Sequence, residues 1–252
     1  EYCLKILEHS PKEKPIVAQL FGSDPVCFEK AAKLVAELGF DGVDINMGCP
    51  DRAIEKQGAG AAMIKTPELA VKIIHTAQEV SSLPVSVKTR IGYNNEILEE
   101  WLTALLEANP AAITLHLRTR KEHSLVPADW ELMKKAIEIR NKINPNVLLI
   151  GNGDVRDRRD GEQKSEEFGA DGVMLGRAMF GNPWVFSRSE NESGESRSLK
   201  EKLAALVELA HGFEKISPPK NFAILKKHIK AFVAGFAGAA DLRAKLMSVE
   251  NA

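Results

Sequence analysis

The sequence alternates six times between a short apolar run and an amphipathic helical pattern, and this alternation limits the fold more than any other feature. The apolar runs cover residues 16–22, 42–45, 83–90, 111–116, 146–150 and 172–175. Within most of them the apolar residues are continuous and do not alternate with polar ones, which is typical of parallel strands buried on both faces. Strand and helix units in series therefore predict an α/β fold with a parallel sheet covered by helices.

Capping residues mark several of the predicted boundaries. Asp24 followed by Pro25 predicts the start of a helix that ends at Gly39. Thr66 is expected to open the next helix in the same way, and Asp129 is expected to cap the helix over residues 130–139. The first of these helices should bury an apolar stripe made of Phe28, Ala31, Leu34, Val35 and Leu38.

Each predicted strand is followed by polar residues or glycine. Functional residues gather after the carboxyl ends of the strands in TIM barrels, so the pattern favours a TIM-type (β/α) barrel. Periodicity alone leaves a doubly wound open sheet possible.

Composition restricts the class of protein. The 252 residues carry 34 Lys and Arg against 35 Asp and Glu, so the global charge does not indicate a nucleic-acid partner. Three cysteines without C-x-x-C spacing argue against a disulfide framework or a zinc site and favour a reducing cytosol. The small and apolar run over residues 231–240 is shorter than the roughly 20 residues of a membrane span. We therefore expect a cytoplasmic monomer without metal or membrane segment.

The C-terminal part of the sequence predicts a separate helical domain. We expect a barrel domain over residues 1–186, a linker rich in Ser, Glu, Asn and Gly over 187–197, and a helical domain over 198–252. Ser198 and Glu201 form the pattern of a capping box, and a break is expected at residues 217–219. Residues 218–247 contain six basic residues against one acid, Asp241. This excess predicts either a solvated helix face or a surface for RNA phosphates.

The strand ends collect residues that could carry chemistry. They are Gln19, Asn46, Cys49, Lys88, Arg90, His116, Arg118, Arg120, Asn152, Asp154 and Arg177. Glycines beside Asn152 and Arg177 would let backbone N–H groups approach a phosphate-bearing cofactor. Lys88 could hold a delocalised anionic ring. Cys49 has no histidine base nearby in the sequence, which favours a proton donor over a nucleophile, because a cysteine thiol is ordinarily protonated at neutral pH.

The same motifs resemble those of the tRNA-dihydrouridine synthase family. The resemblance covers about residues 15–186 and rests on Gln19-Leu20-Phe21-Gly22, Asp41-Gly42-Val43-Asp44-Ile45-Asn46-Met47-Gly48-Cys49-Pro50, Gln57-Gly58-Ala59-Gly60, Val87-Lys88-Thr89-Arg90, His116-Leu117-Arg118-Thr119-Arg120, Ala128-Asp129-Trp130, Gly151-Asn152-Gly153-Asp154 and Gly172-Val173-Met174-Leu175-Gly176-Arg177. The Asn-Met-Gly-Cys-Pro element is the most specific of them.

The resemblance implies an enzyme that binds FMN, takes electrons from NADPH or NADH, and reduces the C5=C6 bond of a uridine in tRNA. It implies that Cys49 is the general acid, and that Gln19, Lys88 and His116 contact the flavin ring. The phosphate would be held by Asn152, Gly153, Asp154, Gly176 and Arg177. The flipped uridine and the tRNA would be contacted by Asn46, Arg90, Arg118, Arg120, Lys226, Lys227 and Lys230.

Two departures from the family pattern keep alternatives open. The family's His-Gly-Arg-Thr-Arg reads His-Leu-Arg-Thr-Arg from His116 to Arg120. The barrel also lacks the family's first two strands, and six strands leave two edges of an eight-stranded barrel exposed. We therefore expect either that the chain, which begins with Glu1, is a fragment of a longer one, or that the barrel is open and flavin binding is impaired. The alternatives are a dihydroorotate-dehydrogenase-like FMN enzyme acting on a free pyrimidine and an inactive tRNA-binding remnant.

Overall fold

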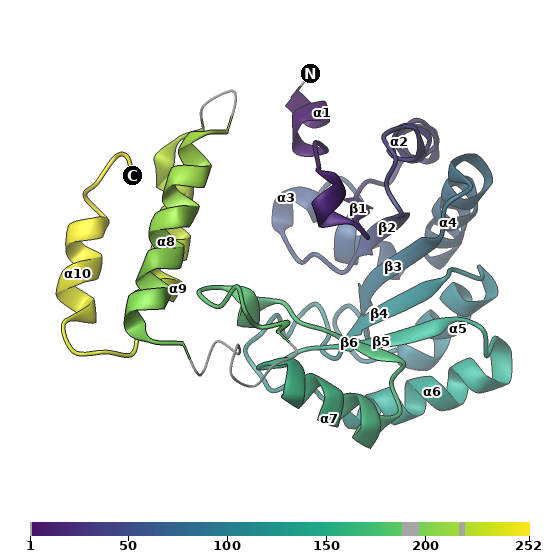
Figure 1. Cartoon of the computed structure of the whole chain (residues 1–252). Helices are drawn as coiled ribbons and strands as arrows, with labels where there is room; N and C mark the ends of the chain where they lie inside the picture. Colours follow the sequence, from purple (N-terminus) through teal and green to yellow (C-terminus); the bar gives the residue numbers. More distant parts are fainter. Residues whose placement is uncertain (1, 188–196, 217–219) are drawn as a thin grey trace. The chain divides into compact units, whose positions relative to one another are not determined.

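A computed structural model of the chain describes residues 2–187, 197–216 and 220–252 (Figure 1). It divides into two compact units. The first contains residues 1–154 and 161–174, and the second contains residues 155–160 and 175–252. Most of the predicted linker and the whole predicted break at 217–219 lie outside the described residues.

The first unit is built on one parallel sheet. Its strands are β1 (Val17–Leu20), β2 (Gly42–Met47), β3 (Val85–Arg90), β4 (Ala112–His116), β5 (Leu148–Asn152) and β6 (Gly172–Met174). They pair in the order β1-β2-β3-β4-β5-β6, and every pair is parallel. Strands in sequence order are those of a (β/α) barrel, whereas a doubly wound sheet changes direction at a switch point. The predicted α/β fold is therefore confirmed, with β1 and β6 at the two ends of the sheet.

Helices cover one face of this sheet (Figure 1). The helical segments that begin in the first unit are α1 (Tyr2–Ile6), η1 (Pro11–Glu13), α2 (Pro25–Glu37), α3 (Arg52–Glu55), η2 (Gly60–Lys65), α4 (Pro67–Ser81), α5 (Leu98–Glu107) and α6 (Glu131–Ile143). Helix α7 (Arg158–Phe168) continues from the second unit into the first. Ile45 of β2, Ile73 of α4 and Trp101 of α5 are completely buried in the core.

Most of the N-cap residues that the sequence predicts begin their helices in the structure. The Asp24 carboxylate accepts a hydrogen bond from Val26 N at the start of α2, and Gly39 ends this helix region with a φ of 78°. Two expectations were wrong. Trp130, not Asp129, occupies the N-cap of α6, and no side-chain bond caps that helix. Leu38, expected in the buried stripe of α2, is 38% exposed because it lies at the C-cap, beyond the last helical turn.

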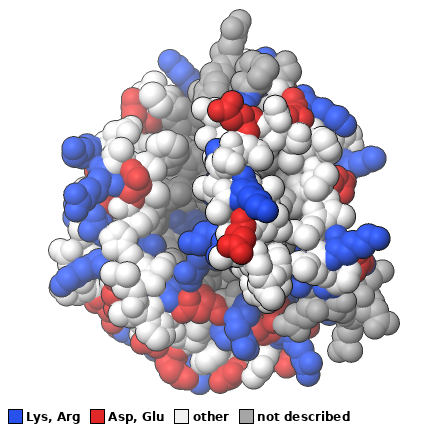
Figure 2. Space-filling model, turned by 90° about the vertical axis from the view of Figure 1, so that its left-hand side faces the viewer, with Lys and Arg blue, Asp and Glu red and all other residues white. Residues whose placement is uncertain are grey.

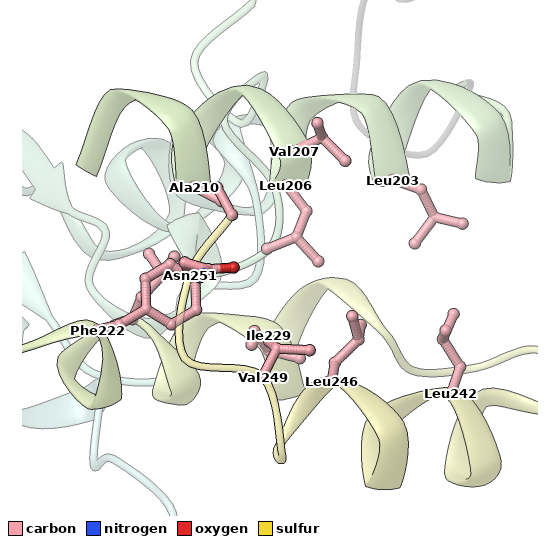
Figure 3. Close-up of a pocket in the computed structure, with 12 residues that line it drawn as sticks. Leu203, Leu206, Val207, Ala210, Phe222, Ile229, Leu242, Leu246, Val249 and Asn251 are labelled. Carbon is pink, nitrogen blue, oxygen red and sulfur yellow. The ribbon is translucent and has the colours of Figure 1, made fainter. Parts of the chain in front are cut away.

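The second unit is helical over most of its described length. It contains η3 (Arg177–Met179), α8 (Leu199–Glu214), η5 (Phe222–Ile224), α9 (Lys226–Phe232) and α10 (Ala239–Leu246). The predicted capping box of Ser198 and Glu201 is present at the start of α8. The core of this unit joins Leu206 of α8 to Ile229 and Phe232 of α9. Leu203 and Leu206 of α8 face Leu246 across an apolar cavity of about 390 Å³ (Figure 3).

None of the described helices combines the length and apolar character that crossing a membrane requires. Among residues 2–187, 197–216 and 220–252, no group of three or more His, Cys, Asp or Glu side chains is placed to hold a metal ion.

Candidate active site

Cys49 lies in the loop that follows β2, as the sequence predicted, and the backbone around it is held from two sides. The Oδ1 atom of Asn46 accepts hydrogen bonds from Gly48 N at 3.1 Å and Cys49 N at 2.9 Å. The Nε atom of Arg90 donates to Gly48 O at 2.8 Å. A Cβ at Gly48 would lie 3.2 Å from the backbone of Thr89, so this loop packs closely on β3. Asn46 and Arg90 therefore fix the main chain that carries the half-buried thiol.

The segment after Cys49 packs against the carbonyl oxygen of this residue. Ala61 N donates to Cys49 O at 2.9 Å. Gly60 has a φ of 61°, and a Cβ there would lie 2.7 Å from the same carbonyl oxygen. Only glycine combines this left-handed conformation with such a close approach. The motif Gly58-Ala59-Gly60 thus serves the geometry of the cysteine loop.

An ion pair joins the segment after Cys49 to the segment after β4. Nε of Arg120 donates to both carboxylate oxygens of Glu55, at 2.8 and 3.0 Å, and NH2 of Arg120 also bonds Oε2. The Arg120 guanidinium lies 5.2 Å from the centre of the Tyr93 ring, and Lys65 Nζ lies 4.2 Å from it. The segments after β2, β3 and β4 are therefore joined by an ion pair and by cation–π contacts with one aromatic ring.

A chain of hydrogen bonds runs beneath the cysteine loop across β1, β2 and β3. Asn46 Nδ2 donates to Gln19 Oε1 at 3.0 Å, and Gln19 Nε2 donates to Asp44 Oδ2 at 2.7 Å. Ser86 Oγ donates to Asp44 Oδ1 at 2.6 Å. Burial raises the pKa of Asp44, while the bonds from Ser86 and Gln19 act in the opposite direction. These bonds fix the orientation of the Gln19 amide.

Lys88 of β3 reaches across the sheet to the end of β5. Its Nζ donates to Asn152 Oδ1 at 3.1 Å, and Asn152 Nδ2 donates to Met174 O at 2.9 Å. Burial, together with the nearby charge of Arg90, lowers the pKa of Lys88 to about 8. The lysine is therefore mostly charged at neutral pH and is available to an anionic ligand.

His116 ends β4 beside these cations. Burial lowers its pKa to about 3, and the charges of Arg90, Lys88 and Arg118 act in the same direction. The ring is therefore neutral at physiological pH. NH1 of Arg118 lies 3.0 Å from His116 Nε2, and NH2 of Arg118 pairs with Asp154.

Arg90 and Arg118 are held almost entirely by the protein. Arg90 is 6% exposed, and its NH1 donates at 3.0 Å to the carbonyl oxygens of Thr119 and His123. Burial lowers the pKa of Arg90 to about 10, so it stays charged at neutral pH. Arg118 is 2% exposed. Together with Lys88 they place three cationic side chains at this end of the sheet, and Asp154 pairs with Arg118.

The strand register aligns these candidates. Asn46 pairs with Lys88, and Arg90, His116 and Asn152 lie in one row across β3, β4 and β5. The structure thus brings together the candidates predicted in the first unit, which are Gln19, Asn46, Cys49, Lys88, Arg90, His116, Arg118, Arg120, Asn152, Gly153 and Asp154.

The other candidates belong to the second unit. Gly176 is the N-cap of η3, and Arg177 is its first residue. Lys226, Lys227 and Lys230 lie on α9, where Lys226 Nζ donates to Met247 O at 2.7 Å. Lys227 and Lys230 are exposed.

The sequence placed Asp44 in the motif around Cys49 but gave it no role, and it did not single out Glu55 or Ser86 as site residues. Asp44 and Ser86 sit inside predicted strands, where a polar residue facing the barrel interior was a usable signal. Glu55 gave no such signal, because its partner Arg120 lies 65 residues away in the sequence.

Comparison with known proteins identifies the family. The family model described as "Dihydrouridine synthase (Dus)" matches residues 1–252. The probable tRNA-dihydrouridine synthase of Staphylococcus aureus (strain COL) is 39% identical over 246 residues, which are 97% of this chain and 74% of that protein. Probable tRNA-dihydrouridine synthase 2 of Bacillus subtilis (strain 168) is 38% identical over 246 residues, covering 97% of this chain and 75% of that protein.

A crystal structure of mandelate oxidase with 3,3-difluoro-2-hydroxy-3-phenylpropionic acid has a TM-score of 0.47 and 16% identity, covering 77% of this chain and 57% of that one. A likeness of this degree bears on neither activity nor ligand. The family match spans the whole chain, and both relatives share more than a third of their aligned residues with it. The chain belongs to the dihydrouridine synthase family.

Proposed function

We propose that this chain is a tRNA-dihydrouridine synthase, an oxidoreductase that reduces the C5=C6 bond of a uridine in tRNA. Membership of the family supports the reaction class. One geometric observation supports the mechanism: the loop of Cys49, fixed by Asn46 and Arg90, lies at the same strand edge as the Lys88–Asn152 pair. A thiol and a cationic site are thus held by one rigid sheet.

The side chains at this edge fit FMN. The amide of Gln19, the ammonium of Lys88 and the neutral ring of His116 are suited to the carbonyl and nitrogen atoms of a flavin ring. Gly153 is buried and has a φ of 126°, and a Cβ there would lie 2.7 Å from Ala128 Cβ, so only glycine fits this position beside Asn152. We propose that the segment Asn152-Gly153-Asp154 takes part in holding the phosphate, and the contacts that the resemblance implies for Gly176 and Arg177 stay a prediction.

Bound FMN, reduced by NADPH or NADH, would supply a hydride to C6 of the uracil ring. The Sγ atom of Cys49 would donate the proton that C5 then needs. The resulting thiolate would regain a proton from solvent. Hydride and proton together add two hydrogen atoms across the double bond, so the reaction balances. The base must leave its stack to reach the thiol.

Four residues predicted to face the substrate make hydrogen bonds within the protein. Asn46, Arg90 and Arg120 hold the loops around Cys49, and Arg118 holds His116. Because Arg90 and Arg118 are less than a tenth exposed, we propose that these two shape the pocket for the uridine and do not bind its phosphates.

The second unit is proposed to bind tRNA phosphates through α9. Acidic and basic side chains are interspersed on the face drawn in Figure 2, as a net charge of −1 suggests, so RNA binding must depend on a local set of cations. Lys227 and Lys230 are exposed on α9, whereas Lys226 donates to Met247 O. Reversing the charge of Lys227 and Lys230 should weaken tRNA binding and reduce its salt dependence. An unchanged salt slope would exclude α9 from the interface.

The test of the catalytic proposal compares two cysteines. Cys49→Ala should keep its yellow flavin absorbance, its reduction by NADPH and its affinity for tRNA, but should lose most of its turnover. Cys27→Ala is the matched control, because Cys27 is exposed on α2. Unchanged turnover in Cys49→Ala would contradict the role of the thiol.

The same assay separates the alternatives. A protein that stays colourless after reconstitution with FMN would favour the inactive remnant. Reduction of a free pyrimidine, with tRNA left unmodified, would favour the dihydroorotate-dehydrogenase-like reading.

A further inference from the structure

The hydrogen bond between Arg118 and His116 determines which ring nitrogen carries the proton. A guanidinium has only N–H donors and cannot accept a hydrogen bond. Since NH1 of Arg118 lies 3.0 Å from His116 Nε2, that nitrogen must accept. The proton of the neutral ring therefore lies on Nδ1.

Arg118 is itself fixed at each donor group. Its Nε donates to Val126 O at 2.6 Å, and its NH2 pairs with Asp154 Oδ2. The same carboxylate oxygen accepts from Ala128 N at 2.9 Å. With only 2% of Arg118 exposed, the guanidinium has a single orientation. It reaches His116 as a preset donor, without rearrangement.

Burial and the surrounding charges keep the ring neutral. Lys88 and Arg90 of β3 and Arg118 on the segment after β4 disfavour a second proton, and only Asp154, which follows β5, favours it. A Cβ at Gly153 would lie 3.3 Å from His116 Cδ2, so the Cδ2–Nε2 edge of the ring is closely packed. Within the described part of the chain, Nδ1 makes no hydrogen bond.

We propose that Arg118 is a positioning residue that locks His116 in the Nδ1–H tautomer, so that His116 presents a hydrogen-bond donor to an acceptor atom of the bound ligand. The acceptor class is a carbonyl oxygen or an unprotonated ring nitrogen of a heteroaromatic ring. The identity of the ligand rests on the proposed function, whereas the tautomer does not.

The direct test is ¹⁵N NMR of histidine-labelled protein without added flavin, with His116 assigned from the signal lost in His116→Gln. The wild-type protein should show the Nδ1–H pattern without titration between pH 5 and 8. Arg118→Met removes the donor and should produce a mixture of tautomers or a titrating ring. Arg118→Lys can still donate to Nε2 and should restore part of the Nδ1–H population. A protonated ring or an Nε2–H ring in the wild type would overturn the proposal, as would an unchanged tautomer in Arg118→Met.

Arg140 provides a matched control for loss of a buried arginine. It is 8% exposed, and its NH1 donates at 3.0 Å to Val147 O and to Asp171 Oδ2. Arg140→Met should lower stability and leave the His116 signal unchanged. A shift of that signal equal to the one in Arg118→Met would mean that the tautomer follows general destabilisation, which contradicts a positioning role.

FMN titration gives a second readout. Arg118→Met should bind FMN up to about tenfold more weakly than the wild type, as expected for one lost hydrogen bond. Equal affinity, with the tautomer changed, would overturn the donor role. If the wild type binds no FMN but shows a pure Nδ1–H ring, the proposed function fails and the tautomer lock stands.

Discussion

The ion pair between Glu55 and Arg120 should contribute measurably to stability because it is mostly removed from water. The Glu55 side chain is 9% exposed and that of Arg120 is 21% exposed. Exposed pairs contribute roughly 0.2–1 kcal/mol, and losing one partner of a fully buried pair costs about 3–5 kcal/mol. With several charge-assisted hydrogen bonds in an intermediate environment, we expect a coupling free energy of about 2 kcal/mol.

The assay is a double-mutant cycle of Glu55→Ala and Arg120→Ala, with the free energy of unfolding measured in urea by tryptophan fluorescence. Glu131 and Lys134 form the control pair, since their side chains are 70% and 50% exposed. Their coupling should stay below about 1 kcal/mol. A Glu55–Arg120 coupling no larger than that of the control pair would refute the reasoning.

The same variants test whether the pair holds the catalytic loop. In a background with Cys3→Ser and Cys27→Ser, an uncharged alkylating reagent reports on Cys49 alone. Glu55→Ala should raise the alkylation rate several-fold, because the segment after Cys49 loses its tie to the loop after β4. If the rate is unchanged, the pair stabilises the unit without ordering the cysteine loop.

Variants at three further positions probe the strand ends and the cysteine loop. Thr89 Oγ1 accepts from Trp101 Nε1 and donates to a β2 carbonyl, both at 3.0 Å. Thr89→Val should cost about 2–4 kcal/mol of unfolding free energy in urea by leaving both groups unpaired, and Thr89→Ser should cost less. Gly60→Ala should cost about 2 kcal/mol or more, because it adds left-handed strain to a close contact with the cysteine loop, and thermal unfolding should show this as a lower Tm. Lys88 has a folded pKa of about 8 against an ordinary 10.5, so the unfolded chain binds more protons between these values and stability should rise with pH across that window. Urea unfolding at several pH values should show that Lys88→Met lacks this rise.

The fold was readable from the sequence because its signals are local. Short runs such as Val85–Arg90 predict the strands. Asp24 and Gly39 predict helix ends because of their own capping and backbone preferences. Asp129 shows where a local rule fails. Trp130 takes the cap position of α6 while its indole Nε1 donates to Gly153 O at 2.9 Å, and a Cβ at Gly151 would lie 2.5 Å from its ring. Tertiary packing of one large side chain outweighs the capping preference of its neighbour.

The site was only partly predictable, for a related reason. Residue types at strand ends indicated Lys88, His116 and Asn152, but not which atoms they would offer. Lys88 and Asn152 meet across 64 residues of sequence, and only the strand register brings them together. The acceptor role of His116 Nε2 likewise depends on where Arg118 lies.

The hydrogen bonds of Arg90 have a consequence for how this site can change. Its acceptors, on Gly48, Thr119 and His123, are all main-chain oxygens, which every amino acid supplies. A substitution at the exposed His123 can therefore alter the surface beside the site and leave this hydrogen bond intact, whereas a side chain at Gly48 would crowd the backbone of Thr89. Replacing the arginine would release both loops at once. Arg90 thus holds the cysteine loop through main-chain atoms, so a loop side chain beside the site can change without loss of these bonds.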